Sequence, residues 1–244
     1  MSGEEILLYF LLATVSFLYS SVGHGGASGY LAIMALFSFG TAEMRQTALL
    51  LNILVSLIAF IQFYSAGYFN FRIFLPLAAT SVPAAFAGGL ITIDTGIYNK
   101  VLGILLLFSV FKLSGITPHK QTQSRESSIV ISLLIGIAIG FVSGLIGIGG
   151  GIILSPILLM LNWADMKQTA AVSSLFILVN SVAGLAGTLV DGGTLTSNLI
   201  WPVIFAIAGG VAGSYLGSRK LNNSFLKRIL AIVLLIASVK LLSI

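Results

Sequence analysis

The sequence GIGGG at residues 147–151 places four glycines in five positions of an otherwise apolar region. A related cluster, GHGG at residues 23–26, lies 124 residues earlier. A second motif follows each cluster, because EMRQTA at residues 43–48 recurs as DMKQTA at residues 165–170. Motifs that recur in the same order at nearly constant spacing indicate an internal repeat.

The repeat divides the chain into three parts. We interpret residues 1–114 as an N-terminal repeat and residues 129–244 as a C-terminal repeat, joined by a polar linker at 115–128. Only 8% of the 244 residues are charged and 57% are hydrophobic, whereas soluble domains carry about 25% charged residues. Such a chain cannot cover its surface with polar side chains. The composition therefore predicts an all-α integral membrane protein whose surroundings are a lipid bilayer.

Each repeat has the same plan. An apolar run (6–22 or 129–145) leads into the glycine cluster, and a short apolar piece (30–39 or 152–161) follows it. The short piece would be about 15 Å long as a helix, roughly half of a bilayer. We therefore predict a hairpin that enters the membrane, turns at the glycines near mid-depth and returns. Three transmembrane helices complete each unit, at about 45–64, 71–91 and 98–114, and at about 167–190, 196–218 and 225–243.

Charge predicts the orientation of the two units. A hairpin without net crossing leaves three crossings per unit, so the two repeats would have inverted topology. With the linker 115–128 in the cytoplasm, nine of the twelve Lys and Arg residues lie on the cytoplasmic side, as the positive-inside rule requires. The net charge of +5 is explained by this bias, so we expect no nucleic-acid partner. The prediction is a multi-pass protein of the cell inner membrane, with both termini outside.

The glycine clusters are the predicted substrate site. Inverted repeats with broken helices are typical of secondary transporters, whose substrate binds near mid-depth. Glycine permits positive φ, and the N-termini of the returning helices favour anions. The alternative is close helix packing, which we assign to Gly209, Gly213 and Gly217 instead. The glycines predicted to bind substrate are Gly23, Gly25, Gly26, Gly147, Gly149, Gly150 and Gly151.

Polar residues inside the apolar runs extend this site. Asn52, Ser173 and Asn180 lie within predicted spans, where polar groups are costly, and they either line the site or bond between helices. His24 either binds substrate or donates to a carbonyl as a neutral ring. No Asp, Glu, Lys or Arg is placed in the middle of a predicted span, and a neutral donor set suits an anion. We expect no metal site and no cofactor.

Secondary candidates lie where the third element of each repeat begins. A cation there would attract an anion to a vestibule on either face, although a cation at an interface also snorkels and Gln or Thr in a first turn also caps a helix. The vestibule candidates are Arg45, Gln46, Thr47, Lys167, Gln168 and Thr169.

These motifs resemble a known family. The glycine cluster 147–151 with Pro156, the segment 167–170 and Asn180 are similar to the second half of TauE/SafE sulfite and organosulfonate exporters. The first half departs from this pattern, because His24 replaces an apolar residue and Ala32 stands where the second half has Pro156. The resemblance covers nearly the whole chain. It implies alternating-access transport, in the export direction, of small sulfur-containing anions such as sulfite or sulfonates, sulfoacetate among them.

Two other classes of function fit the sequence less well. An intramembrane protease would need an activated serine or two membrane aspartates, and the sequence offers only His24 with Ser143. A membrane scaffold or assembly protein would not need glycine breaks within its helices. We therefore expect a transporter that is not an enzyme.

Overall fold

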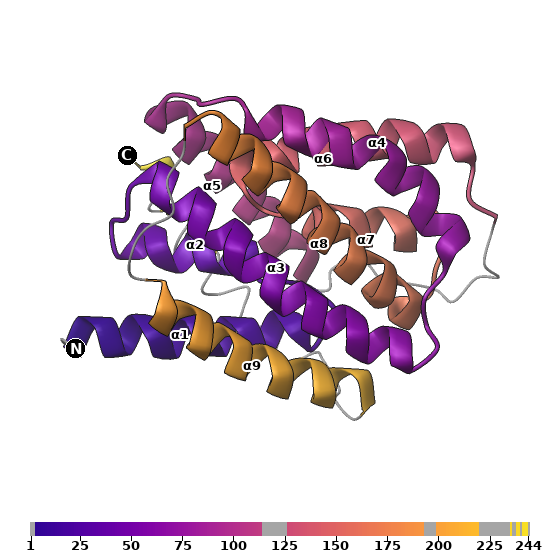
Figure 1. Ribbon diagram of the computed structural model, residues 1–244, viewed down its shortest axis with the longest axis horizontal. Coiled ribbons are helices and arrows are strands. Elements are labelled where there is room, and N and C mark those ends of the chain that lie inside the picture. Colours follow the sequence, from indigo (N-terminus) through magenta and orange to yellow (C-terminus); the bar gives the residue numbers. More distant parts are fainter. Residues whose placement is uncertain are drawn as a thin grey trace.

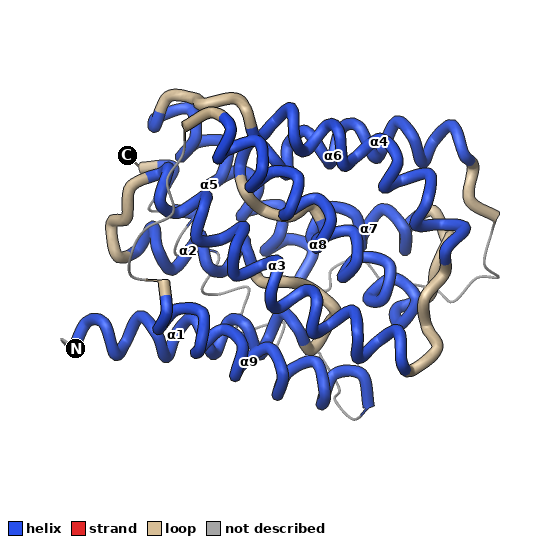
Figure 2. The backbone as a smooth tube through the Cα atoms, viewed as in Figure 1, coloured by secondary structure: helices blue, strands red, loops and turns tan. Residues whose placement is uncertain are grey.

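The computed structural model describes residues 3–113, 126–192 and 199–219, together with residues 235, 238, 239 and 241–243. Within these residues the chain forms helices joined by turns and loops, and no strand (Figure 2). The helices are α1 (Gly3–Ser20), α2 (Ala27–Leu36), α3 (Thr41–Ser65), α4 (Phe71–Gly89), α5 (Thr95–Leu113), α6 (Ile129–Ile146), α7 (Gly151–Met160), α8 (Met166–Val190) and α9 (Ile200–Arg219).

These helices follow the plan predicted for each repeat. In the first, α1 is followed by the glycine cluster, the ten-residue α2 and then α3 to α5; in the second, α6 is followed by its cluster, the ten-residue α7 and then α8 and α9. The helix predicted at 225–243 lies largely outside the described residues. The predicted order of long and short helices is confirmed for the described part of the chain.

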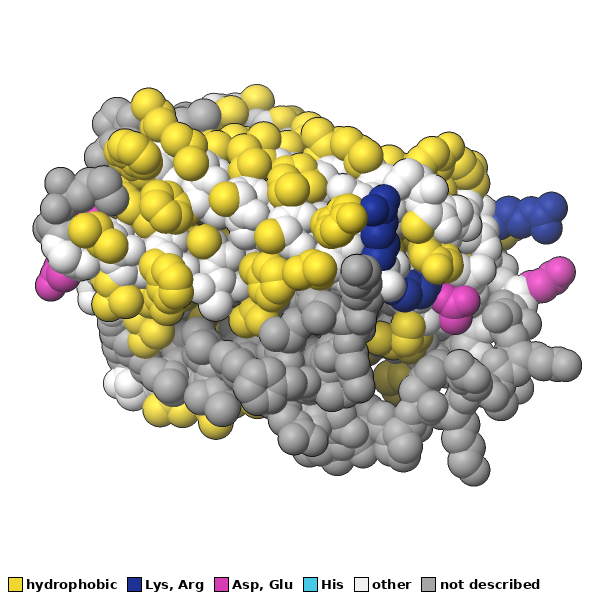
Figure 3. Space-filling view, turned by 90° about the horizontal axis from the view of Figure 1, so that it is seen from below, with side chains coloured by type: hydrophobic (Ala, Val, Ile, Leu, Met, Phe, Trp, Pro, Cys, Tyr) yellow, Lys and Arg dark blue, Asp and Glu magenta, His cyan; other side chains and the backbone are white. Residues whose placement is uncertain are grey.

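Six of the described helices are long and apolar enough to cross a membrane: α1, α3, α4, α6, α8 and α9. Large apolar side chains such as Phe10, Leu134 and Ile200 are exposed on their outer faces. On the face in Figure 3 apolar side chains spread over much of the surface, the acidic side chains lie at or near the two ends, and Lys and Arg side chains lie right of centre and at the right end. A surface of this kind matches lipid rather than water. The protein is an all-helical integral membrane protein.

Helices α3 and α8 cross in the centre of the molecule (Figure 1). One cavity is lined by Thr41 at the start of α3 and by Asp191 just after the end of α8. At the other end, the Lys167 ammonium at the start of α8 lies 5.8 Å from the ring centroid of Phe63, near the end of α3. The two helices therefore run antiparallel.

Two glycine stripes hold the outer helices against each other. On α9, a Cβ added at Gly209, Gly213 or Gly217 would collide with the backbone of α1, which confirms the packing role predicted for these three glycines. On α6, Gly136, Gly140 and Gly144 lie equally close to the backbone of α4. The spacing i, i+4, i+8 is the same in both stripes, because these positions share one face of a helix. Sequence reasoning missed the α6 stripe.

Candidate functional site

Asn52 lies between the two glycine clusters. It is the twelfth of the 25 residues of α3 and is fully buried. Its Oδ1 accepts a hydrogen bond from the Ala27 N–H at 3.0 Å, at the first residue of α2. Its Nδ2 donates to the Ile148 carbonyl at 3.4 Å and to Ser181 Oγ at 3.2 Å. One side chain therefore joins both clusters, halfway along the central helix.

The glycines beside Asn52 are required by its close approach. A Cβ added at Gly25 would overlap Asn52 Oδ1, and one added at Gly149 would overlap Asn52 Nδ2. The sequence reasoning expected these glycines to admit a substrate to the backbone. In the structure, the space that these glycines leave open is filled by the Asn52 amide. Sequence spacing alone could not place Asn52 there.

Each cluster turns through glycines in the left-handed region. Gly23 has φ +76° and Gly26 φ +103°, and in the second cluster Gly147, Gly149 and Gly150 have φ between +71° and +86°. Side chains with a Cβ disfavour this region. Gly23 packs against Ala170 in the first turns of α8, and Gly147 against Arg45 in the first turns of α3. Each turn thus begins near the first turns of a neighbouring helix, away from Asn52. Only the later residues of each cluster lie beside Asn52.

His24 connects the first cluster to α7 and α8. Its Nδ1 lies 3.0 Å from the Val22 carbonyl, and its Nε2 lies 2.9 Å from Ser155 Oγ. Ser155 Oγ is also 2.9 Å from Ser173 Oγ and from the Gly151 carbonyl. The structure therefore brings His24 and Ser173 together through Ser155, which sequence reasoning missed. The signal that could have identified Ser155 is its position, one helical turn after the glycine at which α7 begins.

Ser143 and Asn180 lie elsewhere around the second cluster. His24 pairs with Ser155, so the pairing with Ser143 that an intramembrane protease would need is wrong. The Ser143 Cβ lies 3.5 Å from the position of a Cβ on Gly150. Asn180 Nδ2 donates to the Phe176 carbonyl of its own helix at 2.7 Å. Among the described residues, Ser143 Oγ and Asn180 Oδ1 are buried without a hydrogen-bond partner.

Arg45 is buried at the first turns of α3 and does not snorkel. Its Nε donates to the Gly144 carbonyl at 3.1 Å and its Nη1 to the Ile91 carbonyl at 3.0 Å. Its Nη2 donates to the Gly88 and Gly89 carbonyls at 2.9 and 2.7 Å. These carbonyls end α4 and lie near the end of α6, where helices leave their acceptors unpaired. The guanidinium is therefore a helix cap, and most of its donors are not available to an anion.

Lys167 also caps a helix end, on the opposite side of the molecule from Arg45. Its Nζ donates to the carbonyls of Gly217 and Ser218, at the end of α9, at 2.9 and 3.0 Å. The N-terminal cap of α8 is Asp165, whose Oδ1 accepts from the N–H groups of Lys167 and Gln168. Gln168 stands at the third residue of α8, where a glutamine can complete a capping box with the N-cap residue, and this interpretation stays a prediction. Thr169 does not cap the helix, because its Oγ1 is buried without a partner among the described residues.

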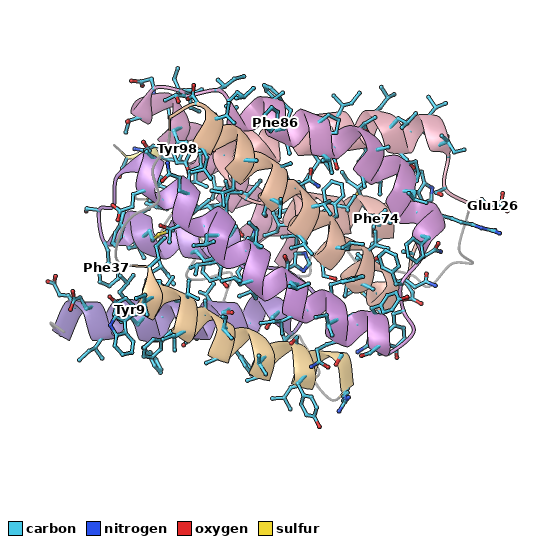
Figure 4. All side chains as sticks on the ribbon, viewed as in Figure 1. Tyr9, Phe37, Phe74, Phe86, Tyr98 and Glu126 are labelled. Carbon is cyan, nitrogen blue, oxygen red and sulfur yellow. The ribbon has the colours of Figure 1, made fainter. Side chains whose placement is uncertain are left out.

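A cavity of about 240 Å³ lies beside Arg45 and Gln46. Thr41, Thr92 and Tyr98 also line it, and Thr92 Oγ1 donates to the Asp191 carboxylate at 2.7 Å. Figure 4 shows Tyr98 at one end of the molecule and Glu126, which lies in the linker, at the other. The cavity therefore opens at the end opposite the linker. Thr47 and Thr169 are buried and do not line it.

Comparisons with known proteins agree with the membrane architecture. A model of the family described as "Sulfite exporter TauE/SafE" matches residues 8–241. A "Probable membrane transporter protein y4hK" of Sinorhizobium fredii is 36% identical over 99% of this chain and 100% of its own length. A "Probable membrane transporter protein MJ0441" of Methanocaldococcus jannaschii is 27% identical over 76% of this chain and 74% of its own. No solved structure matches.

Proposed function

Since this chain belongs to the family of the sulfite exporter TauE/SafE, we propose that it exports small sulfur-containing anions across the cell inner membrane. Sulfite and short sulfonates such as sulfoacetate are the proposed substrates, and alternating access around the junction of the two glycine clusters is the proposed mechanism.

The observation that carries this proposal is the meeting of the two clusters at Asn52. Ala27 N–H and the Ile148 carbonyl come from residues about 120 apart in the sequence, and Asn52 bonds to both. Discontinuous helices that meet at the interface of two repeats are a common substrate site in secondary transporters. The neutral donors at this junction suit an anion that must bind and leave again, because each contributes only about 0.5–1.5 kcal/mol.

The antiparallel arrangement of α3 and α8 supports inverted repeats, since these two helices begin with the recurring motifs EMRQTA and DMKQTA. The midpoint of α3 would lie at mid-depth if α3 crosses the bilayer. Both termini are proposed to face outward and the linker 115–128 inward. Because the sequence has no cysteine, Lys120→Cys tests this directly: an impermeant maleimide added outside should not label it, and labelling of intact cells would contradict the orientation.

Transport is tested in proteoliposomes. Purified protein should carry labelled sulfite or sulfoacetate down its gradient, while rubidium, as a cation control, moves no faster than through empty liposomes. Sulfur-anion fluxes equal to those of empty liposomes would contradict the proposed function. Export is tested in cells, where expression should raise tolerance to sulfite; unchanged tolerance alongside active proteoliposomes would contradict the direction.

A further inference from the structure

The two glycine clusters differ in how their hydrogen-bond donors are satisfied. In the first, the N–H groups of Gly23 and His24 donate to carbonyls at the end of α1 and the N–H of Ala27 donates to Asn52, whereas those of Gly25, Gly26 and Ser28 donate no hydrogen bond within the described residues. In the second, the N–H of Gly147 donates to the Ser143 carbonyl at 2.8 Å. No hydrogen bond within the described part of the chain is donated by the N–H groups of residues 148–152.

Hydroxyls lie beside both clusters. The Tyr30 hydroxyl, which lies against Gly26, has no partner among the described residues. Tyr19 and Ser143, which stand at equivalent positions 124 residues apart, differ from each other. The Tyr19 hydroxyl lies 2.6 Å from Ser28 Oγ, so it is paired. Ser143 Oγ is fully buried and has no partner among the described residues, although Ser143 lies against Gly150. The second cluster therefore collects a hydroxyl and several peptide N–H groups that lack an acceptor.

Such a collection of donors indicates a missing acceptor. Buried N–H and O–H groups are nearly always paired in proteins, because leaving them unpaired costs free energy. These N–H groups also form the N-terminus of the ten-residue α7, where the helix dipole favours a negative charge. In the first cluster the protein supplies the acceptor itself, as the Asn52 amide oxygen 3.0 Å from the Ala27 N–H.

We propose that the oxyanion group of the substrate binds at the second cluster, to the N–H groups of residues 149–152 and the Ser143 hydroxyl. At the first cluster the Asn52 amide takes the corresponding place and accepts from the Ala27 N–H. This inference rests on the proposed function for the identity of the anion, a sulfite or sulfonate group with three acceptor oxygens. Ile139, Phe176 and Ile177 pack around the second cluster, so the apolar remainder of a bound sulfonate has to be small.

Equivalent hydroxyls provide the test. We compare Ser143→Ala with the matched control Tyr19→Phe, measuring binding of sulfite to purified protein by calorimetry. Loss of a charge-assisted bond should raise the Kd of Ser143→Ala about tenfold, whereas Tyr19→Phe should stay within about twofold of wild type. In the absence of ligand, Ser143→Ala should unfold at a temperature no lower than wild type, because its hydroxyl has no partner to lose.

A larger loss of affinity in Tyr19→Phe than in Ser143→Ala would overturn the assignment of the site. The same variants are measured with sulfoacetate, phosphate and acetate. If wild type binds phosphate or acetate, with the same dependence on Ser143, and no sulfur anion, the site stands and the proposed substrate class fails. If it binds sulfite equally well in all three proteins, the substrate class stands and the site fails. Absence of binding to every oxyanion would overturn both.

Discussion

Arg45 and Lys167 occupy equivalent positions in the two recurring motifs, and both cap helix ends within their own repeat. They differ in reach. Arg45 is buried and donates to four carbonyls from two repeats, whereas Lys167 is half-buried and donates to two carbonyls of a single helix. Arginine carries five donors in a planar fork and lysine one compact ammonium. The comparison shows that hydrogen bonds of Arg45 join the two repeats at one end of the molecule. At the other end, the hydrogen bonds of Lys167 join helices of a single repeat.

The glycine clusters extend this contrast between the halves. In the first half, Asn52 accepts from the Ala27 N–H and the Tyr19 hydroxyl pairs with Ser28. In the second half, the N–H groups of residues 148–152 and the Ser143 hydroxyl have no acceptor among the described residues. A repeated motif therefore keeps its backbone form in both halves while its side-chain partners differ.

The largest expected effect comes from valine in either cluster. Gly150→Val should abolish transport, because φ at this residue is +76° and a Cβ would meet Ile139 and Phe176. Gly25→Val should also abolish transport, because its side chain would displace the Asn52 amide. Flux is measured in proteoliposomes, with membrane insertion and monodispersity in detergent as controls for folding. Wild-type rates in both variants would move the site away from the clusters.

The next effect separates the two caps. Arg45→Ala should lower the free energy of unfolding by on the order of 3 kcal/mol, since it leaves three buried carbonyls and one partly buried carbonyl without this donor. Lys167→Ala should lower it by about 1 kcal/mol, the value of a cation at a partly exposed helix end. Thermal unfolding in detergent measures both, and Arg45→Lys serves as the control that keeps the charge. Equal losses of unfolding free energy in the two alanine variants would show that the additional carbonyls bound by Arg45 do not stabilise the protein.

A smaller effect is expected at Asn52. Asn52→Ala should cost about 2 kcal/mol, because it leaves the Ala27 N–H and the Ile148 carbonyl without their partner. Ser56→Ala is the matched control one turn along α3, since Ser56 Oγ bonds only to a carbonyl of its own helix. If the two variants unfolded at the same temperature, Asn52 would not be the connection between the clusters.

The sequence predicted the helices better than the contacts between them. Composition, repeat and glycine spacing were enough for the order of long and short helices, because these depend on local periodicity and on length. The carbonyl bonds of Arg45, the cap at Asp165 and the link through Ser155 depend on which helix ends meet. A single sequence contains no direct record of such tertiary contacts. The glycine clusters and Asn52 carry a strong local signal in the sequence, and their role in binding substrate stays a prediction. Ser143 was considered only as a partner of His24.

The smallest effect is expected at His24, where the first cluster contacts α7. The Val22 carbonyl can only accept, so the nitrogen 3.0 Å from it, Nδ1, carries a proton. In the neutral ring Nε2 can only accept, so it competes with the Gly151 carbonyl for the single proton of Ser155 Oγ. Protonation of Nε2 turns it into a donor to Ser155 Oγ, leaves the hydroxyl proton to the Gly151 carbonyl and adds a positive charge near the glycine clusters. An anion should therefore bind more tightly as pH falls through the range in which histidine ordinarily titrates.

His24→Gln tests this prediction, because glutamine retains a hydrogen-bond donor and acceptor but does not titrate. Between about pH 8 and pH 5.5, wild type should bind methanesulfonate, which keeps its charge over this range, several-fold more tightly, and the variant should show no such change. Calorimetry at each pH measures the Kd. The variant should differ from wild type by less than about threefold at the alkaline end, where a neutral imidazole and an amide offer similar bonds. Parallel profiles in the two proteins would make His24 a purely structural link between the clusters, and the junction at Asn52 would then have to attract the anion without any titrating group.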